Sequence, residues 1–181
     1  MNKKVLVTGG GGYIGTNLVN FLLTKNYKVT VLDTFWFGNY LKKNKNLSII
    51  KKDIRNISPR DINNITTIIH LASIANDPAG DLDAGLTWDV NVLSTYKLIN
   101  LAIKQKVKKF IFASSGSVYG IKKEQKVTEN LSLEPLSEYN KSKMVCERIL
   151  LSYKSFIDLT ILRPATVCGF SKSMRLDVAV N

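Results

Sequence analysis

A tyrosine and a lysine four residues apart, Tyr139 and Lys143, form the pair in this sequence best suited to proton transfer. Residues at i and i+4 share one face of a helix, so the two side chains are expected to lie together. A lysine ammonium beside a phenol stabilises the phenolate and lowers a pKa ordinarily near about 10 toward neutral pH. The spacing therefore predicts a proton-transfer catalyst, and it also fits an ordinary surface pair on a helix.

A serine lies at the predicted end of a strand. Ser115 follows the apolar run KKFIFAS, which begins at Lys108 and ends at Ser114. Open α/β sheets bind ligands at the carboxyl ends of their strands, and a hydroxyl there can hydrogen-bond a substrate oxygen. We therefore expect Ser115 to join the tyrosine and the lysine in one catalytic site.

A glycine-rich stretch, VTGGGGYIG, comes between an apolar run and a helical pattern. Gly9, Gly12 and Gly15 follow a GxxGxxG spacing, in the order strand, turn, helix that a dinucleotide-binding fold requires. Glycine lets main-chain N–H groups approach a pyrophosphate at the positive end of the helix. The stretch predicts a nucleotide cofactor, and a plain flexible turn is the weaker alternative.

An aspartate, Asp33, ends the next predicted strand, about twenty residues beyond the turn. A carboxylate at this position accepts hydrogen bonds from the ribose hydroxyls of the adenosine and repels a 2′-phosphate. No arginine follows it in TFWFGN, so the sequence favours NAD over NADP. The alternative is an aspartate that caps the following turn.

Short β-branched runs alternate with longer helical patterns along the whole chain, which is typical of βαβ units and a parallel sheet. We predict a doubly wound α/β Rossmann fold with six strands, at residues 4–9, 28–33, 47–51, 66–72, 108–114 and 156–164. Apolar residues at helical spacing predict helices around residues 14–22, 88–99 and 145–153. The last segment, SKSMRLDVAVN, has the apolar pattern of a helix start.

The composition bounds the class of protein. With 181 residues, 45% of them hydrophobic, the chain is long enough for one domain with a real core. The net charge of +12 comes from lysines that are scattered rather than clustered with aromatics, so we expect no nucleic-acid binding. The sequence has no export signal and no membrane span, which predicts a cytoplasmic protein. Its two cysteines lack metal-ligand spacing and are expected to be free thiols in or near the core.

Further motifs extend these patterns over nearly the whole chain: KKDIRN, HLAS, ASSGSVYG, YNKSK and LRPATVCG. Together with the glycine turn they resemble the extended short-chain dehydrogenase/reductase family, the nucleotide-sugar epimerases and dehydratases. The resemblance implies an NAD-binding Rossmann domain at residues 1–165. It also implies that residues 166–181 begin a C-terminal substrate-binding lobe that is otherwise missing.

The resemblance assigns roles residue by residue. Tyr139 would remove the proton from a sugar hydroxyl, Lys143 would also hold the nicotinamide ribose, and Ser115 would fix the reacting oxygen. The cofactor-binding positions it implies, besides the three glycines and Asp33, are Tyr13, Ile14, Asp53, Ile54, Leu71, Ala72, Ser73, Pro164 and Ala165. Asn91 would be structural support, and no metal site is expected.

Two small residues after Ser115 favour one activity within the family. Sugar dehydratases place an aspartate and a glutamate there, but this chain has Gly116 and Ser117, neither of which can act as a general acid or base. A nucleotide-sugar epimerase resembling 4-epimerases is therefore predicted. A ketosugar reductase, a dehydratase and a truncated non-catalytic NAD-binding module remain alternatives.

Several polar or aromatic residues near the expected site have an ordinary structural explanation. Asn76 is a candidate substrate contact, as is Ser117. One of two aspartates, Asp81 or Asp83, is expected to cap a helix. The single histidine, His70, is expected to be structural. Trp36 and Phe37 either cover the adenine or pack internally.

Family members usually dimerise by packing two helices from each subunit into a four-helix bundle. In this chain those helices are expected at residues 84–104 and 138–154, which are long enough to present apolar rows. We expect a homodimer that binds a nucleotide sugar.

Overall fold

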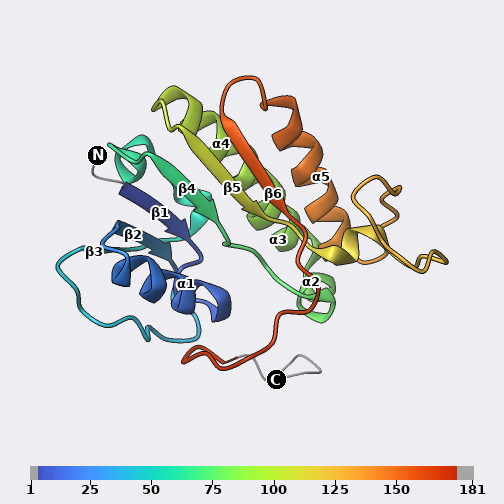
Figure 1. Ribbon diagram of the computed structural model, residues 1–181, viewed down its shortest axis with the longest axis horizontal. Helices are drawn as coiled ribbons and strands as arrows, with labels where there is room; N and C mark the ends of the chain where they lie inside the picture. The colour runs from blue at the N-terminus through green and yellow to red at the C-terminus, as the bar shows by residue number, and fades with distance from the viewer. Residues whose placement is uncertain (1–3, 175–181) are drawn as a thin grey trace.

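Six parallel strands form the centre of the molecule (Figure 1). The computed structural model describes residues 4–174. The strands lie in the order β3-β2-β1-β4-β5-β6, and all five neighbouring pairs are parallel. Their bounds are β1 Lys4–Thr8, β2 Lys28–Asp33, β3 Leu47–Lys51, β4 Thr67–His70, β5 Lys109–Ala113 and β6 Asp158–Leu162. Each falls within one predicted run, so the predicted doubly wound sheet is confirmed.

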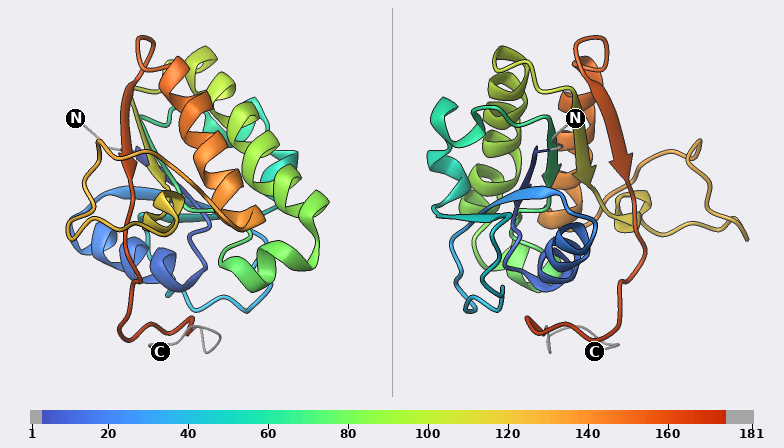
Figure 2. Two further views of the ribbon diagram at one scale, coloured as in Figure 1. Left: turned by 90° about the vertical axis from the view of Figure 1, so that its right-hand side faces the viewer. Right: turned by 60° about the vertical axis from the view of Figure 1, so that its left-hand side comes forward.

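The helices cover the two faces of the sheet unequally (Figures 1 and 2). One face carries α1, whereas α4 and α5 lie side by side on the other, as right-handed crossovers in the two halves of the sheet require. The helix bounds are α1 Tyr13–Thr24, α2 Asp77–Leu82, α3 Ala84–Trp88, α4 Ser94–Lys104 and α5 Glu138–Ser152. Short helical turns are η1 Ile54–Asn56, η2 Pro59–Ile62, η3 Asp89–Leu93 and η4 Gly116–Tyr119.

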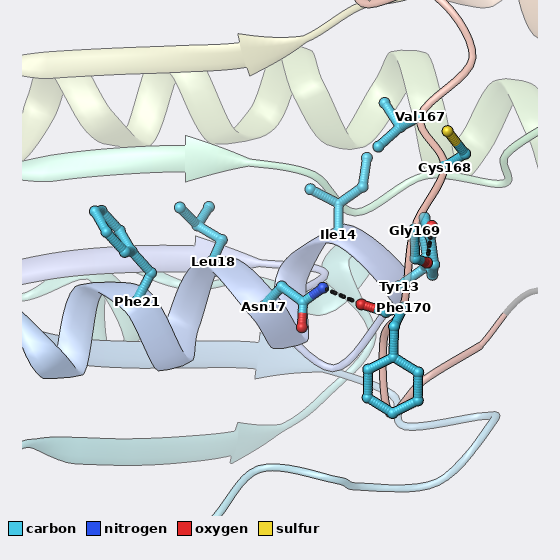
Figure 3. Close-up of a pocket in the computed structure, with 9 residues that line it drawn as sticks. All are labelled: Tyr13, Ile14, Asn17, Leu18, Phe21, Val167, Cys168, Gly169 and Phe170. Carbon is cyan, nitrogen blue, oxygen red and sulfur yellow. Dashed lines mark hydrogen bonds between the residues drawn. The ribbon is translucent and has the colours of Figure 1, made fainter.

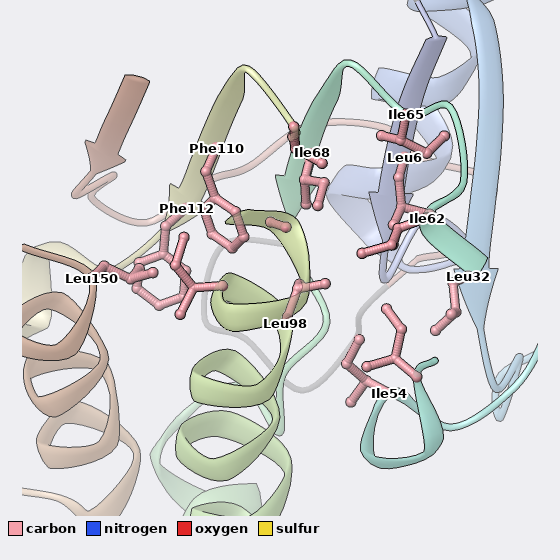
Figure 4. Packing of buried hydrophobic residues seen from close by; sticks show 14 of the residues in the cluster. Leu6, Leu32, Ile54, Ile62, Ile65, Ile68, Leu98, Phe110, Phe112 and Leu150 are labelled. Carbon is pink, nitrogen blue, oxygen red and sulfur yellow. The ribbon is translucent and has the colours of Figure 1, made fainter. Parts of the chain in front are cut away.

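Alternating residues of the strands supply two separate hydrophobic clusters. Val5 and Val7 face α1 and pack with Val19, whereas Leu6 between them points to the opposite face. The larger cluster lies between the sheet and α4 and α5, and also takes in the turns after β3 (Figure 4). Its fully buried large side chains include Leu6, Leu32, Ile62, Ile68, Leu98, Phe110, Phe112 and Leu150. Burial of such side chains contributes most of the driving force for this arrangement.

The helix expected over residues 84–104 is interrupted. Asp89–Leu93 form a π-helical segment, η3, between α3 and α4. Asn91, in the middle of this segment, donates to the carbonyl of Ile74 at 3.0 Å and to Ser142 Oγ at 2.9 Å, and it accepts from the N–H of Ile74 at 2.8 Å. Extra residues in a helical turn are often found where a side chain must be aimed at a particular partner. The structural role expected for Asn91 is confirmed.

The carboxyl ends of four strands meet at one edge of the sheet. The chain after β4 is tied to β1 by the N–H of Leu71, which donates to the carbonyl of Thr8 at 3.0 Å. The chain after β5 is tied to β6 in the same way, from Ser114 N–H to Leu162 at 2.8 Å. The glycine turn, residues 71–73, Ser115 and residues 164–165 are therefore gathered along this edge.

No helix among residues 4–174 is long and apolar enough to span a membrane. The predicted helix start in SKSMRLDVAVN falls mostly on residues 175–181, outside the described residues. Of the two cysteines, Cys146 is buried as expected, whereas Cys168 is exposed, so the expectation of a core position is wrong for Cys168.

Candidate active site

Two of the three motif glycines are required by the protein's own packing. Gly9 has a φ of +72°, and a Cβ there would lie 2.5 Å from the main-chain nitrogen of Ala72. A Cβ on Gly15 would overlap the carbonyl oxygen of Gly9. The turn, the start of α1 and the chain after β4 can pack this closely only because both positions lack side chains.

Gly12 is different, because none of its described neighbours requires glycine there. Its φ of −77° suits any residue, and the nearest atom that a Cβ would meet is the carbonyl oxygen of Gly9 at 3.4 Å, an ordinary contact. Gly12 is also the N-cap of α1, and the first turn of this helix, from Tyr13, contains no acidic residue. Main-chain N–H groups at a helix N-terminus attract anions. The missing side chain thus leaves space for an anionic group from outside.

Asp33 connects the glycine turn to the loop after β2. One carboxylate oxygen accepts from the N–H of Gly11 at 2.8 Å and the other from the N–H of Phe35 at 2.7 Å. Phe35 has a φ of +56°. Its ring lies so close to Gly11 that a Cβ on Gly11 would be 2.6 Å from the ring carbons of Phe35. Asp33 thus caps the following turn, which was the alternative interpretation. Each of its oxygens keeps a further lone pair for a ribose hydroxyl, and that role stays a prediction.

The positions expected around the adenine differ in what they can offer. The Arg55 side chain donates to Asp53 and holds the pKa of that carboxyl below its usual value. Asp53 also caps η1 through the N–H of Arg55. The side chain of Ile54 is 4% exposed and belongs to the large core cluster, so only its main chain can face a ligand. Trp36 and Phe37 are 58% and 81% exposed, so neither is packed inside.

The segment after β4 lies against the glycine turn, and its role in lining the cofactor stays a prediction. Leu71 and Ala72 make the close main-chain approach to Gly9. Ser73 Oγ donates to Asn91 Oδ1 at 3.0 Å and lies 2.8 Å from the carbonyl of Ile74. The segment is therefore fixed from both sides, by the glycine turn and by the π-helical segment.

Tyr139 and Lys143 lie in the first half of α5, which Ser137 caps by accepting from the N–H of Asn140 at 3.2 Å. Lys143 is buried, with 3% of its surface exposed, and its Nζ donates to the carbonyl of Ala113 at 2.9 Å. The same nitrogen is 5.7 Å from the centre of the Tyr139 ring and 4.9 Å from that of Phe112. Burial lowers the pKa of Lys143 to about 8, so the ammonium is charged at neutral pH and close to the phenol.

Ser115 is part of a chain of three polar side chains. Its Oγ lies 2.7 Å from Ser117 Oγ, and Ser117 in turn donates to Asn140 Oδ1. Ser115 also caps η4 by accepting from the N–H of Ser117 at 3.2 Å. Asn140 was missed by the sequence analysis, although its position next to Tyr139 is a signal that could have found it.

A buried ion pair supports this end of the site and was also missed. Glu147, which is 1% exposed, pairs with Arg163 at 2.6 Å. Glu147 also accepts from Ser114, and Arg163 donates to Tyr119 Oη at 2.7 Å. The hydrogen bonds from Arg163 to Glu147 raise the arginine pKa further above its usual value. Glu147 lies four residues after Lys143, so its spacing was a readable signal for the same helix face.

Pro164 and Ala165 lie beside the turn that holds Ser115. The carbonyl of Pro164 accepts from the N–H of Gly116 at 2.7 Å. A Cβ on Gly116 would be 3.2 Å from that oxygen and 3.6 Å from the Cα of Ala165. The chain after β6 is thus drawn toward Ser115, where the resemblance expects the nicotinamide.

Three other candidates have structural partners. Asn76 has a φ of +78° and caps α2 by accepting from the N–H of Ala79 at 2.9 Å, while its contact with substrate stays a prediction. Asp83 caps α3, as expected for one of the two aspartates. His70 is buried between Thr8 and Thr95, at 2.6 and 2.9 Å, and burial lowers its pKa to about 3, which agrees with a structural role.

The chain after β6 continues across the start of α1 and borders a pocket of about 340 Å³ (Figure 3). Tyr13 Oη donates to the carbonyl of Gly169 at 2.5 Å, and Asn17 donates to that of Phe170 at 2.9 Å. Tyr13 is thereby held at the N-terminus of α1 by its side chain. Among the residues described, no group of three or more His, Cys, Asp or Glu side chains is arranged to hold a metal.

Comparison with known proteins gives consistent matches. A family model, the NAD dependent epimerase/dehydratase family, matches residues 5–178. The putative UDP-glucose 4-epimerase of Methanocaldococcus jannaschii is 35% identical over 171 residues, covering 91% of this chain and 56% of that protein.

Two solved structures extend the comparison to three dimensions. The UDP-N-acetylglucosamine 4-epimerase of Methanobrevibacter ruminantium, in complex with UDP-N-acetylmuramic acid, superposes with a TM-score of 0.85 at 31% identity, over 90% of this chain and 54% of that one. The UDP-glucose 4-epimerase of Thermus thermophilus, in complex with NAD, gives 0.79 at 29% identity, over 88% and 54%.

This chain thus spans about half the length of the relatives it matches. The match of the family model nevertheless runs through the glycine turn, the serine, the tyrosine and the lysine in order. On this evidence the chain belongs to the NAD-dependent epimerase/dehydratase family.

Proposed function

We propose that this chain carries the nucleotide-binding and catalytic half of an NAD-dependent nucleotide-sugar epimerase, with a reaction resembling 4-epimerisation. The observation that supports this most directly is Lys143, a buried ammonium held by the carbonyl of Ala113 and 5.7 Å from the Tyr139 ring. A buried charge is costly, so a fold keeps one mainly where it has a task. The task that we propose for the Lys143 ammonium is to stabilise the phenolate of the nearby Tyr139.

The residues present fit NAD. The pyrophosphate has room at Gly12 and N–H groups at the start of α1 around Tyr13 and Ile14. Asp33 offers lone pairs to the adenosine ribose, and Lys143 lies at the other end to hold the nicotinamide ribose. The remaining contacts come from Gly9, Gly15, Asp53, Ile54, Leu71, Ala72, Ser73, Tyr139, Pro164 and Ala165. When bound, NAD accepts a hydride from the sugar carbon and later returns it to that carbon.

Tyr139 acts as the base. As a phenolate it takes the proton of the sugar hydroxyl while the C–H bond on the same carbon breaks, so that the C–O single bond becomes a carbonyl. Lys143 stabilises the phenolate, and Ser115 holds the reacting oxygen. The centre is inverted when the sugar turns its other face before the hydride returns to the carbon, and Tyr139 gives its proton back to the oxygen in the same step.

Epimerisation is favoured over dehydration because of the residues that follow Ser115. Gly116 packs against Pro164 and has no functional group, and Ser117 is hydrogen-bonded to Asn140. Neither supplies the acid and base needed to eliminate water. Ser117 and Asn76 are proposed to contact the sugar, since both lie close to elements that carry Ser115 and Tyr139.

We further propose that residues 1–165 form the NAD-binding domain and that 166–181 begin the substrate-binding lobe. Two subunits would associate through α4 and α5 and the segments before them, in a four-helix bundle. Leu93, Tyr96 and Leu151 on these elements are 60%, 51% and 40% exposed, which is the kind of apolar surface such a contact covers. Sedimentation of the protein, with Tyr96→Glu as the disrupting variant, tests the dimer.

The activity is tested by incubating the protein with NAD and either UDP-glucose or UDP-N-acetylglucosamine, and analysing the sugars. The proposal expects conversion to the C4 epimers with no net change in the cofactor, and loss of conversion in Tyr139→Phe with NAD binding retained. Stoichiometric oxidation of NADH by a ketosugar would instead indicate a reductase. NAD binding without conversion would indicate a non-catalytic module.

A further inference from the structure

The carboxylate of Asp33 is held at both of its oxygens. Oδ2 accepts from the N–H of Gly11 at 2.8 Å, and Oδ1 accepts from the N–H of Phe35 at 2.7 Å. A carboxylate that turned away would leave both main-chain donors without these bonds, and hydrogen bonds to a charged group are among the stronger ones in proteins. Asp33 therefore has a fixed position at the end of β2.

Phe35 takes part in this arrangement in a strained conformation. A φ of +56° is an outlier for a bulky residue and persists where the surrounding contacts compensate for its cost. The N–H of Phe35 donates to Asp33, its carbonyl accepts from the N–H of Gly38 at 3.1 Å, and its ring packs on Gly11 and against the hydrophobic cluster between the sheet and α1. Without the ring, the strain would remain and its main compensation would be lost, so the turn would relax and release Asp33.

The position of the Asp33 carboxylate decides between two cofactors. NAD has a hydroxyl at the 2′ position of its adenosine ribose, to which a carboxylate offers a lone pair, whereas NADP has a phosphate there, which a carboxylate repels. A site with this aspartate accepts NADP well when the carboxylate can turn away. In this chain, turning away would break the bonds from Gly11 and Phe35.

We propose that Phe35 is a specificity-determining residue, whose ring on Gly11 keeps Asp33 from turning away and so excludes NADP. The inference rests on the part of the proposed function that places NAD at this site. Two further aromatic residues follow directly, Trp36 and Phe37, but they are 58% and 81% exposed. They lack the packing that holds Phe35 and therefore provide matched controls.

The test is the ratio of the dissociation constants of NADP and NAD, measured by titration with each cofactor. In Phe35→Ala, which keeps the strain without the packing, we expect this ratio to fall about tenfold, the value of one hydrogen bond to a charged group. Phe35→Tyr keeps the ring and should retain the wild-type ratio, as should Trp36→Ala. Gly11→Ala places a Cβ 2.6 Å from the Phe35 ring, so it displaces the ring by another route and should also lower the ratio.

A second measurement needs no cofactor. Exchange of the Gly11 amide proton with deuterium, followed by NMR in the protein without ligands, reports how often Asp33 turns away, because this proton is bound to its carboxylate. We expect about tenfold faster exchange in Phe35→Ala and wild-type exchange in Trp36→Ala. Unchanged exchange in Phe35→Ala would show that the ring does not hold Asp33, and would overturn the inference.

A purely structural role for Phe35 would change both dissociation constants by the same factor. An unchanged ratio in Phe35→Ala, or an equal fall in Trp36→Ala, would therefore overturn the inference, and so would a wild type that binds NADP as tightly as NAD. Failure of the proposed function has a different signature. A wild type that binds NAD and converts no sugar would not be an epimerase, and the ratio would still decide the role of Phe35.

Discussion

The two ends of the candidate site are built in different ways. At the glycine turn, the shape comes from main chain packed on main chain, with Gly9 against Ala72 and Gly15 against the Gly9 carbonyl. At the serine and tyrosine end, the shape comes from side chains that hold one another, from Ser115 to Asn140 and from Glu147 to Arg163. The first end cannot admit one added carbon at Gly9 or at Gly15, whereas the second depends on charge and protonation. Substitutions and changes of pH should therefore affect the stability of the two ends differently.

The largest effect is expected where the side-chain end is most deeply buried. Arg163→Ala leaves the carboxylate of Glu147, 1% exposed, without its partner. Removing one partner of a buried ion pair costs about 3–5 kcal/mol, which urea unfolding measures. The double variant Glu147→Leu with Arg163→Leu is the control and should recover much of that loss. A cost below about 1 kcal/mol in Arg163→Ala would mean that water reaches this pair.

At the glycine end, neighbouring positions of one motif should behave differently. Gly15→Ala places a carbon on the Gly9 carbonyl and should cost about 1–3 kcal/mol of unfolding free energy, because the main chain must shift. Gly12→Ala makes only an ordinary contact and should cost at most about 1 kcal/mol, as an N-cap change does. NAD titration should nevertheless show that Gly12→Ala weakens binding. Equal stability losses in the two variants would remove the distinction between a packing glycine and a ligand glycine.

Lys143→Met should stabilise the fold while it abolishes activity. The pKa of Lys143 is lowered from 10.5 to about 8, so the unfolded chain binds more protons between these values and the wild type gains stability as the pH rises through that window. The variant avoids the cost of the buried charge, which is fully present below pH 8. We expect an increase in the unfolding free energy of about 1–3 kcal/mol at pH 7, disappearing toward pH 10.5.

Exposed Lys154 provides the matched control, since Lys154→Met should leave the pH dependence as it is. A Lys143→Met protein less stable than the wild type at pH 7 would show that the bond to Ala113 outweighs the cost of burial.

The smallest effect is expected between the two ends, at Asn76. Asn76→Gly removes the cap of α2 but relieves a φ of +78°, so the unfolding free energy should change by only about 0.5 kcal/mol or less. If Asn76 contacts the sugar, KM should rise with kcat nearly unchanged. A KM equal to that of the wild type would reduce Asn76 to a helix cap.

The parts of the fold that could be predicted are those with local signals. All six strands were predicted from β-branched runs, and the helices α1, α4 and α5 from apolar periodicity, because these patterns are local in the sequence. The short helix α2 was not predicted. Gly9 and Gly15 were predicted as ligand-binding glycines, yet the structure also gives them a packing reason, because Gly9 meets Ala72 far away in the sequence and Gly15 meets Gly9 across the turn. Only contact with Ala72 and with the turn itself reveals it.

The parts of the site that the sequence did not predict depend on tertiary contacts between distant segments. Asn140 and Glu147 lie on the same helix as the predicted pair, but their partners Ser117 and Arg163 come from the segments around β5 and β6. Periodicity places a residue on a face and does not say what it meets there. The π-helical segment was also missed, because the hydrogen bonds of Asn91 to Ile74 and Ser142 that accompany it are not local.

The order of the strands also bears on how the chain can assemble during synthesis. Starting from β1, the strands on one side are β2 and then β3, and those on the other are β4, β5 and β6. Each strand that leaves the ribosome can therefore join an edge that already exists, and no strand has to insert between two others. The longest wait of the growing sheet is at β1, which presents its second edge from residue 8 until residue 67 arrives, whereas β4 and β5 present their free edges over shorter stretches of chain.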